Sequence, residues 1–130
     1  MVATPHLYWG WRQPLSANDI RQAVAELNGL IRAKGVGVTI LPGCEIPLSP
    51  DLLENLERGE WMSLGDNART VLVEPPWQGW HADATDTLRR LIDAGWTVVL
   101  AHPERNSVLQ REMSLVTDLV QMGVHLQVTV

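Results

Sequence analysis

The chain has 130 residues, of which 45% are hydrophobic and 19% charged, and these proportions are typical of a folded chain rather than a disordered one. The formal net charge of -5 provides no electrostatic attraction for nucleic acid or an anionic membrane, and no apolar run has the length of a membrane span. The single cysteine and an N-terminus without the pattern of a secretion signal favour a cytoplasmic location. We expect one domain over residues 1–130.

The first predicted elements are a short strand and a long helix. Residues 1–4 predict a strand that leads into His6. Ser16 occupies the N-cap position of the helix, with Asp19 three residues later, which is a variant of the capping box. Gly35 predicts the end of this helix. Apolar residues recur at helical spacing and predict one buried face: Ile20, Ala23, Val24, Leu27, Leu30 and Ile31.

The same unit of a helix, a glycine and an apolar strand recurs along the chain. Residues 36–43 predict the strand before Glu45, and the next helix is expected to have Ser49 as N-cap and Pro50 at its first position. The remaining units are a helix ending at Gly59 with strand 70–74, a helix ending at Gly95 with strand 96–102, and a helix ending at Gly123 with strand 124–130. Short, valine-rich strands that alternate with helices predict an α/β fold whose parallel strands are covered on both faces.

Four successive predicted strands deliver a histidine or a glutamate at their C-terminal ends: His6, Glu45, Glu74 and His102. These ends lie on one rim of a parallel α/β fold, so the four side chains are expected to converge. Converging carboxylates and imidazoles without basic partners favour a bound divalent cation. Nitrogen and oxygen ligands without a thiolate suit Mn²⁺, Fe or Zn²⁺, and a bridging glutamate suits two-metal chemistry on phosphate esters. Arg105 is expected to hold a phosphate with its planar guanidinium.

Each polar residue also has a structural interpretation. A lone glutamate or histidine at a strand end more often caps a helix or forms a salt bridge than binds a metal. Glu104 is expected to cap a helix or pair with a base, and His125, near the opposite rim, is expected to have a structural role. His81 follows the loop WQGW and has two interpretations, a residue that borders the cleft or an ordinary core or surface residue. Trp77 and Trp80 have two interpretations, a stacking wall for an aromatic substrate or packing beneath a loop.

Two other chemistries are excluded by motif. A cysteine-dependent phosphatase needs an arginine six residues after its nucleophile, but Pro50 occupies that position after Cys44. The stretch KGVGVT lacks the spacing of a dinucleotide or phosphate-binding loop.

The segments ATPH, LPGCEI, LVEPPW, GWTVVLAHPERN and GVHLQVTV resemble, in order and spacing, the bacterial capsular polysaccharide tyrosine phosphatases of the PHP (polymerase and histidinol phosphatase) superfamily. The resemblance covers essentially the whole chain. It implies a metal-dependent phosphotyrosine phosphatase on a distorted parallel (β/α)7 barrel, with a cluster of about three metal ions, often manganese, and attack by a metal-bound water. It also implies a substrate, the tyrosine-rich tail of a bacterial kinase that controls capsule or exopolysaccharide synthesis.

The resemblance implies roles for individual residues. Glu45 corresponds to the bridging carboxylate, Glu74 and His102 to ligands of the second ion, and His6 to a ligand of the third. Arg105 corresponds to the arginine that contacts phosphate.

The chain departs from the family at both ends. The family pattern has a His-x-His strand before TPH and an Asp-x-His strand after LQVT, and neither is present. Because a barrel of this type needs roughly 200 residues, we expect an incomplete barrel. Its open apolar edges favour a homo-oligomer. Two alternatives remain open: a catalytically inactive fragment that acts as a binding or oligomerisation module, and a small-molecule phosphoesterase of the same superfamily.

Overall fold

The computed structural model describes residues 1–7, 15–66 and 69–129. Helices alternate with strands along this part of the chain, as the sequence predicts. The elements are α1 Ala17–Ala33, β1 Glu45–Pro47, α2 Leu52–Glu57, β2 Thr70–Glu74, α3 Ala84–Asp93, β3 Thr97–Ala101, the 3-10 helix η1 Pro103–Arg105, α4 Met113–Met122 and β4 His125–Gln127. No helix within the described residues combines the length and the apolar character that crossing a membrane requires.

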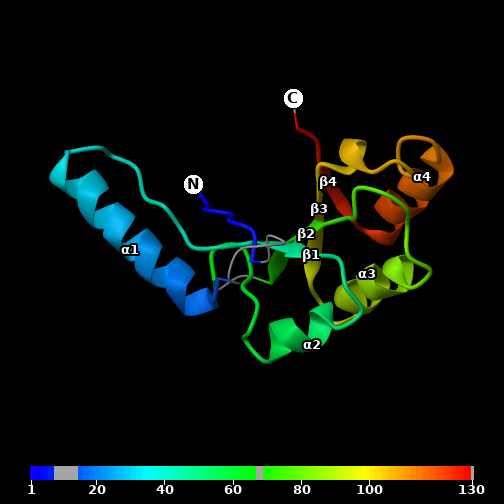
Figure 1. The fold of residues 1–130 in the computed structure, drawn as a ribbon, viewed down its shortest axis with the longest axis horizontal. Coiled ribbons are helices and arrows are strands. Elements are labelled where there is room, and N and C mark those ends of the chain that lie inside the picture. Colours follow the sequence, from blue (N-terminus) through cyan, green and yellow to red (C-terminus); the bar gives the residue numbers. More distant parts are fainter. Residues whose placement is uncertain (8–14, 67–68, 130) are drawn as a thin grey trace.

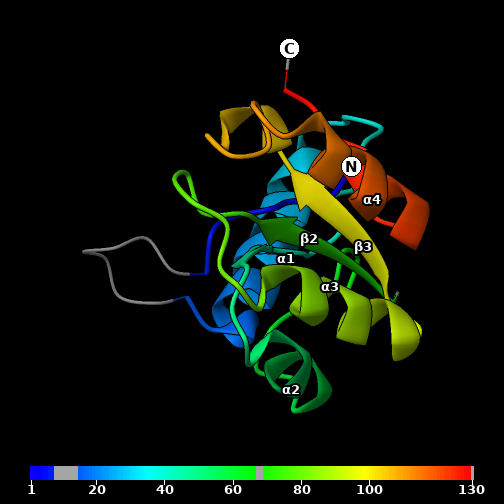
Figure 2. The same ribbon diagram turned by 90° about the vertical axis from the view of Figure 1, so that its right-hand side faces the viewer.

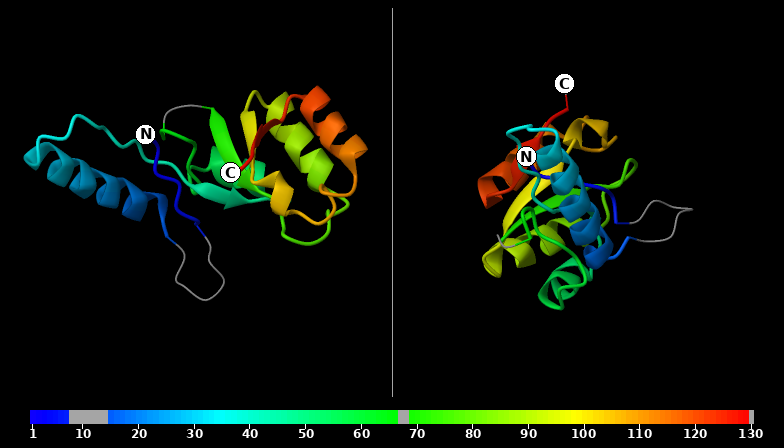
Figure 3. Two further views of the ribbon diagram at one scale, coloured as in Figure 1. Left: turned by 90° about the horizontal axis from the view of Figure 1, so that it is seen from above. Right: turned by 90° about the vertical axis from the view of Figure 1, so that its left-hand side faces the viewer.

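The four strands form one parallel sheet in the order β1-β2-β3-β4. Strand order therefore follows chain order without reversal, which is typical of a barrel-type winding and differs from the reversal of doubly wound sheets. Figures 1 and 3 show α3 and α4 at one end of the molecule and α1 at the other. The expected parallel α/β fold is confirmed.

The N-terminal segment extends the sheet on the β1 side. Val2 and His6 form isolated parallel bridges with Leu41 and Glu45. The Ala3 amide donates to the Leu41 carbonyl at 2.9 Å. The predicted strand at residues 1–4 therefore exists as a parallel neighbour of the sheet, although its pairing is too sparse to form a regular strand.

The predicted strand at 36–43 is largely wrong, because the regular strand β1 begins only at Glu45. The backbone at Ile40 is instead satisfied by a side chain of α1: its amide donates to Asn28 Oδ1 at 2.9 Å, and its carbonyl accepts from Asn28 Nδ2 at 2.8 Å. Val36 and Val38 are 50% and 41% exposed. Valine favours a strand only where it packs on a half-buried surface, and this segment offers none.

The start of α1 is as predicted, but the start of α2 is not. Ser16 caps α1 in a complete capping box with Asp19, and hydrogen bonds from Ser16 lower the pKa of the Asp19 carboxyl. The predicted cap and first residue of α2, Ser49 and Pro50, lie outside that helix, whose N-cap is Asp51. Prolines at both 47 and 50 keep this connection in a turn before the helix begins.

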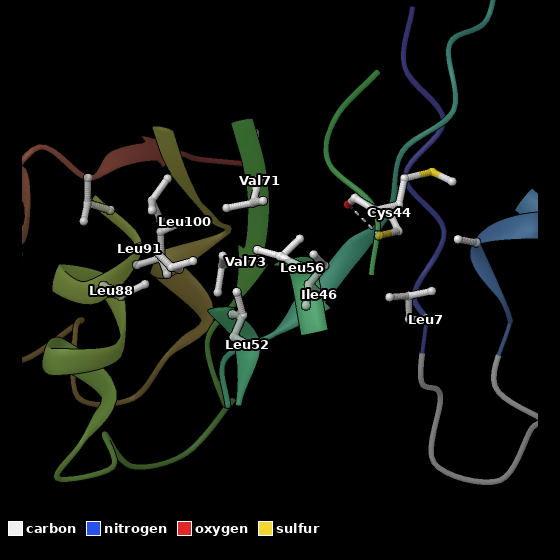
Figure 4. Packing of buried hydrophobic residues seen from close by; sticks show 14 of the residues in the cluster. Leu7, Cys44, Ile46, Leu52, Leu56, Val71, Val73, Leu88, Leu91 and Leu100 are labelled. Carbon is white, nitrogen blue, oxygen red and sulfur yellow. Dashed lines mark hydrogen bonds between the residues drawn. The ribbon is translucent and has the colours of Figure 1, made fainter. Parts of the chain in front are cut away.

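Both faces of the central strands are covered. Figure 4 shows Val71, Val73 and Leu100 packed against leucines of α2 and α3. Leu72, which points to the opposite face, is only 4% exposed. Figure 2 shows α3 lying along β2 and β3. The strands therefore have the two-sided burial that their continuous apolar sequences predict.

The apolar face predicted for α1 is only partly covered. Ile20 and Val24 are 3% and 7% exposed, whereas Leu27 and Leu30 are 44% and 63% exposed. The first two turns of the helix therefore pack on the body of the protein, and the later turns extend away from it (Figure 1).

Candidate metal centre

The first two candidate residues meet through strand register. His6 and Glu45 are paired across the parallel bridge between the N-terminal segment and β1, so their side chains emerge on the same face. His6 Nε2 lies 3.7 Å from Glu45 Oε1. Glu45 is 8% exposed, and its neighbours Cys44 and Ile46 are fully buried on the opposite, helix-covered face. The carboxylate therefore projects from a packed backbone into the inner face of the sheet.

Glu74 joins this pair from the end of β2. Its register partner is Pro47, two residues beyond Glu45, so Glu74 shares the inner face one step nearer the C-terminal rim. Its Oε2 lies 3.5 Å from His6 Nε2. One ligand atom from each of His6, Glu45 and Glu74 can be chosen so that all three lie within 4.8 Å of one another. This spacing permits a single ion to contact all three.

His102 reaches the cluster through an unusual backbone conformation. Strand alternation from Ala101 would direct residue 102 toward the helix-covered face. Instead, His102 has φ 31° and ψ 54°, in the left-handed region, where histidine is among the less disfavoured residues. Its amide donates to the Gln127 carbonyl at the end of β4, at 2.7 Å. The imidazole Nε2 lies 2.7 Å from Glu45 Oε1 and 3.7 Å from Glu74 Oε1.

The structure thus brings together all four residues predicted at the strand ends. Among the described residues, the ion-pair partners of Glu45 and Glu74 are the two imidazoles, and no lysine or arginine pairs with either carboxylate. Imidazole nitrogens and carboxylate oxygens are ligands for Mn²⁺, Fe and Zn²⁺. The donor set, its spacing and the burial of Glu45 all fit a divalent cation.

Arg105 follows His102 by three residues, and the ion pair of its guanidinium is with Glu104 rather than with a residue of the cluster. It ends η1, and its amide donates to the His102 carbonyl at 2.9 Å. Its guanidinium is half exposed and lies 3.9 Å from Glu104 Oε1. Glu104 therefore pairs with a base, as expected, and its Oε1 also accepts from the Thr129 amide at 3.3 Å.

The two tryptophans that follow β2 have different surroundings. Trp80 packs against the core, and its indole donates to Thr85 Oγ1 at 3.0 Å. Trp77 is 65% exposed, and its indole Nε1 donates to Glu74 Oε1 at 3.4 Å. Packing beneath a loop therefore describes Trp80, whereas Trp77 borders the candidate metal centre.

Asn106 is a structural residue that the sequence interpretation missed. Its side chain is 1% exposed. The amide nitrogen donates to the carbonyls of Pro76 and Gly79, and Oδ1 accepts from the amides of Val108 and Leu109. Asparagine combines two donors with two acceptor lone pairs, and all four are used. Asn106 therefore ties the loop after β2 to the loop after β3.

The remaining histidines and the cysteine lie outside the cluster. His81 is exposed and lines a cavity of about 350 Å³ with Asp83 and Thr87. His125 begins β4 at the opposite rim, as expected. Cys44 is fully buried, its Sγ donates to the Met62 carbonyl at 3.0 Å, and burial raises the pKa of the thiol to about 11. A buried thiol with a raised pKa is a poor nucleophile.

Comparison with known proteins identifies relatives over the whole length of the chain. Tyrosine-protein phosphatase YwqE of Bacillus subtilis is 30% identical over 129 residues, which are 99% of this chain and 50% of that protein. Tyrosine-protein phosphatase CpsB of Streptococcus pneumoniae is 32% identical over 91 residues, 70% of this chain and 37% of that protein. The chain spans about half the length of the curated relatives that it matches over its whole length.

A solved structure shares the fold. It comes from a study of YwqE from Bacillus subtilis and CpsB from Streptococcus pneumoniae, described as unique metal-dependent tyrosine phosphatases. It matches with a TM-score of 0.91 at 29% identity over 98% of this chain and 51% of the solved chain. This match confirms the expected PHP-type fold, of which the four-stranded sheet forms part. The family model for capsular polysaccharide synthesis, CpsB/CapC, matches residues 1–130, and the chain therefore belongs to the CpsB/CapC family.

Proposed function

We propose that this chain carries part or all of the active site of a metal-dependent protein-tyrosine phosphatase that acts in the control of capsule or exopolysaccharide synthesis. The observation that carries the proposal is the convergence of two imidazoles and two carboxylates from four separate segments on one rim. The named activities of YwqE and CpsB support the phosphotyrosine substrate. The proposed protein substrate is the tyrosine-rich tail of a bacterial kinase.

The proposed ligands are His6, Glu45, Glu74 and His102. Glu45 Oε1 is close to both imidazoles, which suits a carboxylate that bridges two ions. A bound divalent cation would polarise a phosphoryl oxygen and lower the pKa of a water molecule. Because the donors are nitrogen and oxygen atoms, Mn²⁺ is the proposed ion, with Fe or Zn²⁺ as alternatives.

Arg105 is the proposed phosphate-binding residue. Its guanidinium is half exposed and paired only loosely with Glu104, at 3.9 Å, so exchange of that carboxylate for a phosphate costs little. The fork geometry of arginine suits two phosphoryl oxygens at once. In this role Arg105 would bind and orient the ester while His6, Glu45, Glu74 and His102 hold the cation.

A second candidate function follows from the length comparison. The chain matches only about half of its curated relatives, and this alternative supposes that residues needed for turnover lie outside the matched half. In this alternative the chain binds a cation and a phosphorylated partner without turnover. Hydrolysis of phosphate esters by the 130-residue chain would exclude it.

The test measures bound metal and turnover together. The wild-type chain, E45Q and the matched surface control E60Q are purified after addition of Mn²⁺, and their metal content is determined by elemental analysis. Hydrolysis of para-nitrophenyl phosphate and of a phosphotyrosyl peptide is then followed. We expect E45Q to lose metal and any activity by about 100-fold, because it removes the carboxylate shared by both imidazoles, and E60Q to match wild type. Equal metal content in E45Q and E60Q would refute the site.

We also propose that the chain self-associates through its sheet edges. The outer side of β4 has no partner strand among the described residues, and Val128 just beyond it is 59% exposed. Unpaired apolar edges are templates for strand addition. Light scattering at micromolar concentration should give a mass above that of one chain, and a mass of 14.5 kDa would contradict the proposal.

A further inference from the structure

The loop after β2 places an exposed aromatic side chain beside the candidate metal centre. Trp77 is 65% exposed, although tryptophan is an amphipathic residue that folded chains tend to bury. One edge of its ring is fixed, since Nε1 donates to Glu74 Oε1 at 3.4 Å. The same carboxylate lies 3.7 Å and 3.5 Å, through its two oxygens, from the imidazoles of His102 and His6. The indole is therefore one hydrogen bond from the cluster, with most of its surface open to solvent.

The backbone that carries Trp77 is anchored on both sides. The Trp77 carbonyl accepts from the Ser107 amide at 3.1 Å. The carbonyls of Pro76 and Gly79, which flank Trp77, both accept from the buried Asn106 amide. An exposed aromatic ring on a backbone held at three points is preorganised, because little conformational freedom remains to be lost when a ligand packs on it.

We propose that Trp77 is a specificity-determining residue that stacks on the aromatic ring of an aryl phosphomonoester whose phosphate lies at the cluster. The inference rests on the proposed phosphatase function and adds a basis for choosing aryl over alkyl esters. A phosphoseryl group has no ring to stack on the indole, whereas phosphotyrosine carries an aromatic ring directly bonded to its phosphate oxygen. Offset or edge-to-face contact between two rings stabilises such a complex beyond simple burial of area.

The indole has a second possible role, orientation of Glu74 through its N–H group, and two variants separate the roles. W77F keeps an aromatic face but has no N–H donor, whereas W77L keeps apolar volume but has neither ring nor donor. L30A is the control for loss of an exposed apolar side chain, since Leu30 is 63% exposed on α1, at the other end of the molecule (Figure 1).

The experiment compares two peptides of identical sequence that carry phosphotyrosine or phosphoserine. For the chain supplied with Mn²⁺, both the ratio of kcat/KM values and the ratio of binding affinities, by calorimetry, are measured. We expect W77L to lower the preference for phosphotyrosine about tenfold, and W77F to keep it within about threefold of wild type. L30A should leave the preference unchanged.

The outcomes separate this inference from the proposed function. An unchanged preference in W77L, or equal losses in W77F and W77L, would overturn the stacking role. Equal binding of the two peptides by wild type, or binding of neither, would overturn it as well. A chain that binds phosphotyrosine with a preference lost only in W77L, yet hydrolyses neither peptide, would refute the proposed catalysis and support the role of Trp77.

Discussion

Asn106 offers the sharpest test of how the site is held together. Its side chain makes four hydrogen bonds, two to carbonyls of the loop after β2 and two to amides of its own loop. The Asn106 side chain itself is 1% exposed, and among its partners Leu109 is buried, Pro76 and Val108 are partly buried, and Gly79 is exposed. N106A therefore removes the partner of two carbonyl acceptors and two amide donors, of which water can reach those nearer the surface. N106D changes only one group, because aspartate has the same shape and keeps the oxygen that accepts from Val108 and Leu109.

The expected cost of N106A follows from these four bonds. A hydrogen bond contributes about 1 kcal/mol net, so loss of all four corresponds to about 4 kcal/mol, reduced to about 3 kcal/mol if water enters the vacated space. For a domain of this size each kcal/mol lowers Tm by about 4 °C, which gives a fall of about 12 °C. The loss in N106A should be independent of pH, since no titrating group is added.

N106D should instead lose stability as pH rises. Its new oxygen would face the carbonyls of Pro76 and Gly79, and both repulsion and burial raise the pKa of the introduced carboxyl in the folded state. When the pKa of a carboxyl is raised in the folded state, its contribution to the free energy of unfolding is fully present below the pKa of the unfolded state, about 3.9. That contribution is lost as pH rises through the pKa of the folded state. Between pH 4 and 7 the difference in Tm between wild type and N106D should therefore widen.

Urea and thermal unfolding, followed by tryptophan fluorescence at pH 4, 5.5 and 7, would measure these differences. Each variant is compared with wild type at the same pH, so any effect of pH on the wild-type protein cancels. The stability lost in N106D should change with pH, whereas the stability lost in N106A should not. Two results would refute the reasoning: a loss below 1 kcal/mol in N106A, or parallel pH profiles for the two variants. Either would mean that water or neighbouring groups replace Asn106 readily.

Three further predictions follow from the structure. In G43A the new Cβ would lie 3.1 Å from the Ala3 carbonyl oxygen, so we expect a loss of about 1–3 kcal/mol in urea unfolding and weaker metal binding by calorimetry; wild-type values for both would contradict it. C44A should lower the free energy of unfolding by about 1–2 kcal/mol and leave any phosphatase activity unchanged. The thiol of the folded protein, with its pKa raised to about 11, should react with iodoacetamide at pH 8 only on unfolding. Rapid alkylation of the folded protein would count against this prediction. Arg21 lowers the pKa of the Asp66 carboxyl, so D66N should cost about 0.5 kcal/mol at pH 7 for this partly exposed pair, and the difference should close as pH falls below about 3.9 through the lowered folded value; a constant difference would rule out the ion pair as its source.

The sequence predicts the candidate site better than it predicts the elements that carry it. His6, Glu45 and Glu74 lie on the inner face because strand alternation and register place them there, and both follow from the order of apolar runs. The position of β1 was nevertheless wrong by most of a strand. The valines of the predicted segment 36–43 satisfy the strand pattern, but the local hydrogen-bond partner of the Ile40 backbone is the side chain of Asn28, twelve residues earlier in a helix. A side chain that takes the place of a neighbouring strand in this way leaves no periodic pattern in the sequence.

Two features of the rim, the conformation of His102 and the role of Asn106, could not be predicted from hydrophobic periodicity. His102 enters the cluster only because its backbone adopts a left-handed conformation, and the proline that follows it in the sequence disfavours a helical backbone at 102 without selecting that conformation. In the sequence Asn106 resembles any other loop residue. Only the structure shows that its side chain forms hydrogen bonds with both the loop after β2 and the loop after β3. Both depend on contacts between segments that only the folded chain brings together, so a single sequence records the residues but not their roles.

The burial of Glu45 links the fold to the proposed chemistry. Its backbone is held on both sides of β1, by Leu72 in the sheet and by the Pro5 carbonyl, which accepts from the Glu45 amide at 3.0 Å. The carboxylate therefore cannot withdraw to solvent without disrupting the sheet. An uncompensated buried carboxylate costs on the order of several kcal/mol, and its ion-pair partners among the described residues are the imidazoles of His6 and His102. A divalent cation held by these imidazole nitrogens and carboxylate oxygens would balance that charge. The sheet thus fixes a buried carboxylate in a position where a divalent cation, if the proposed site binds one, would stabilise its charge.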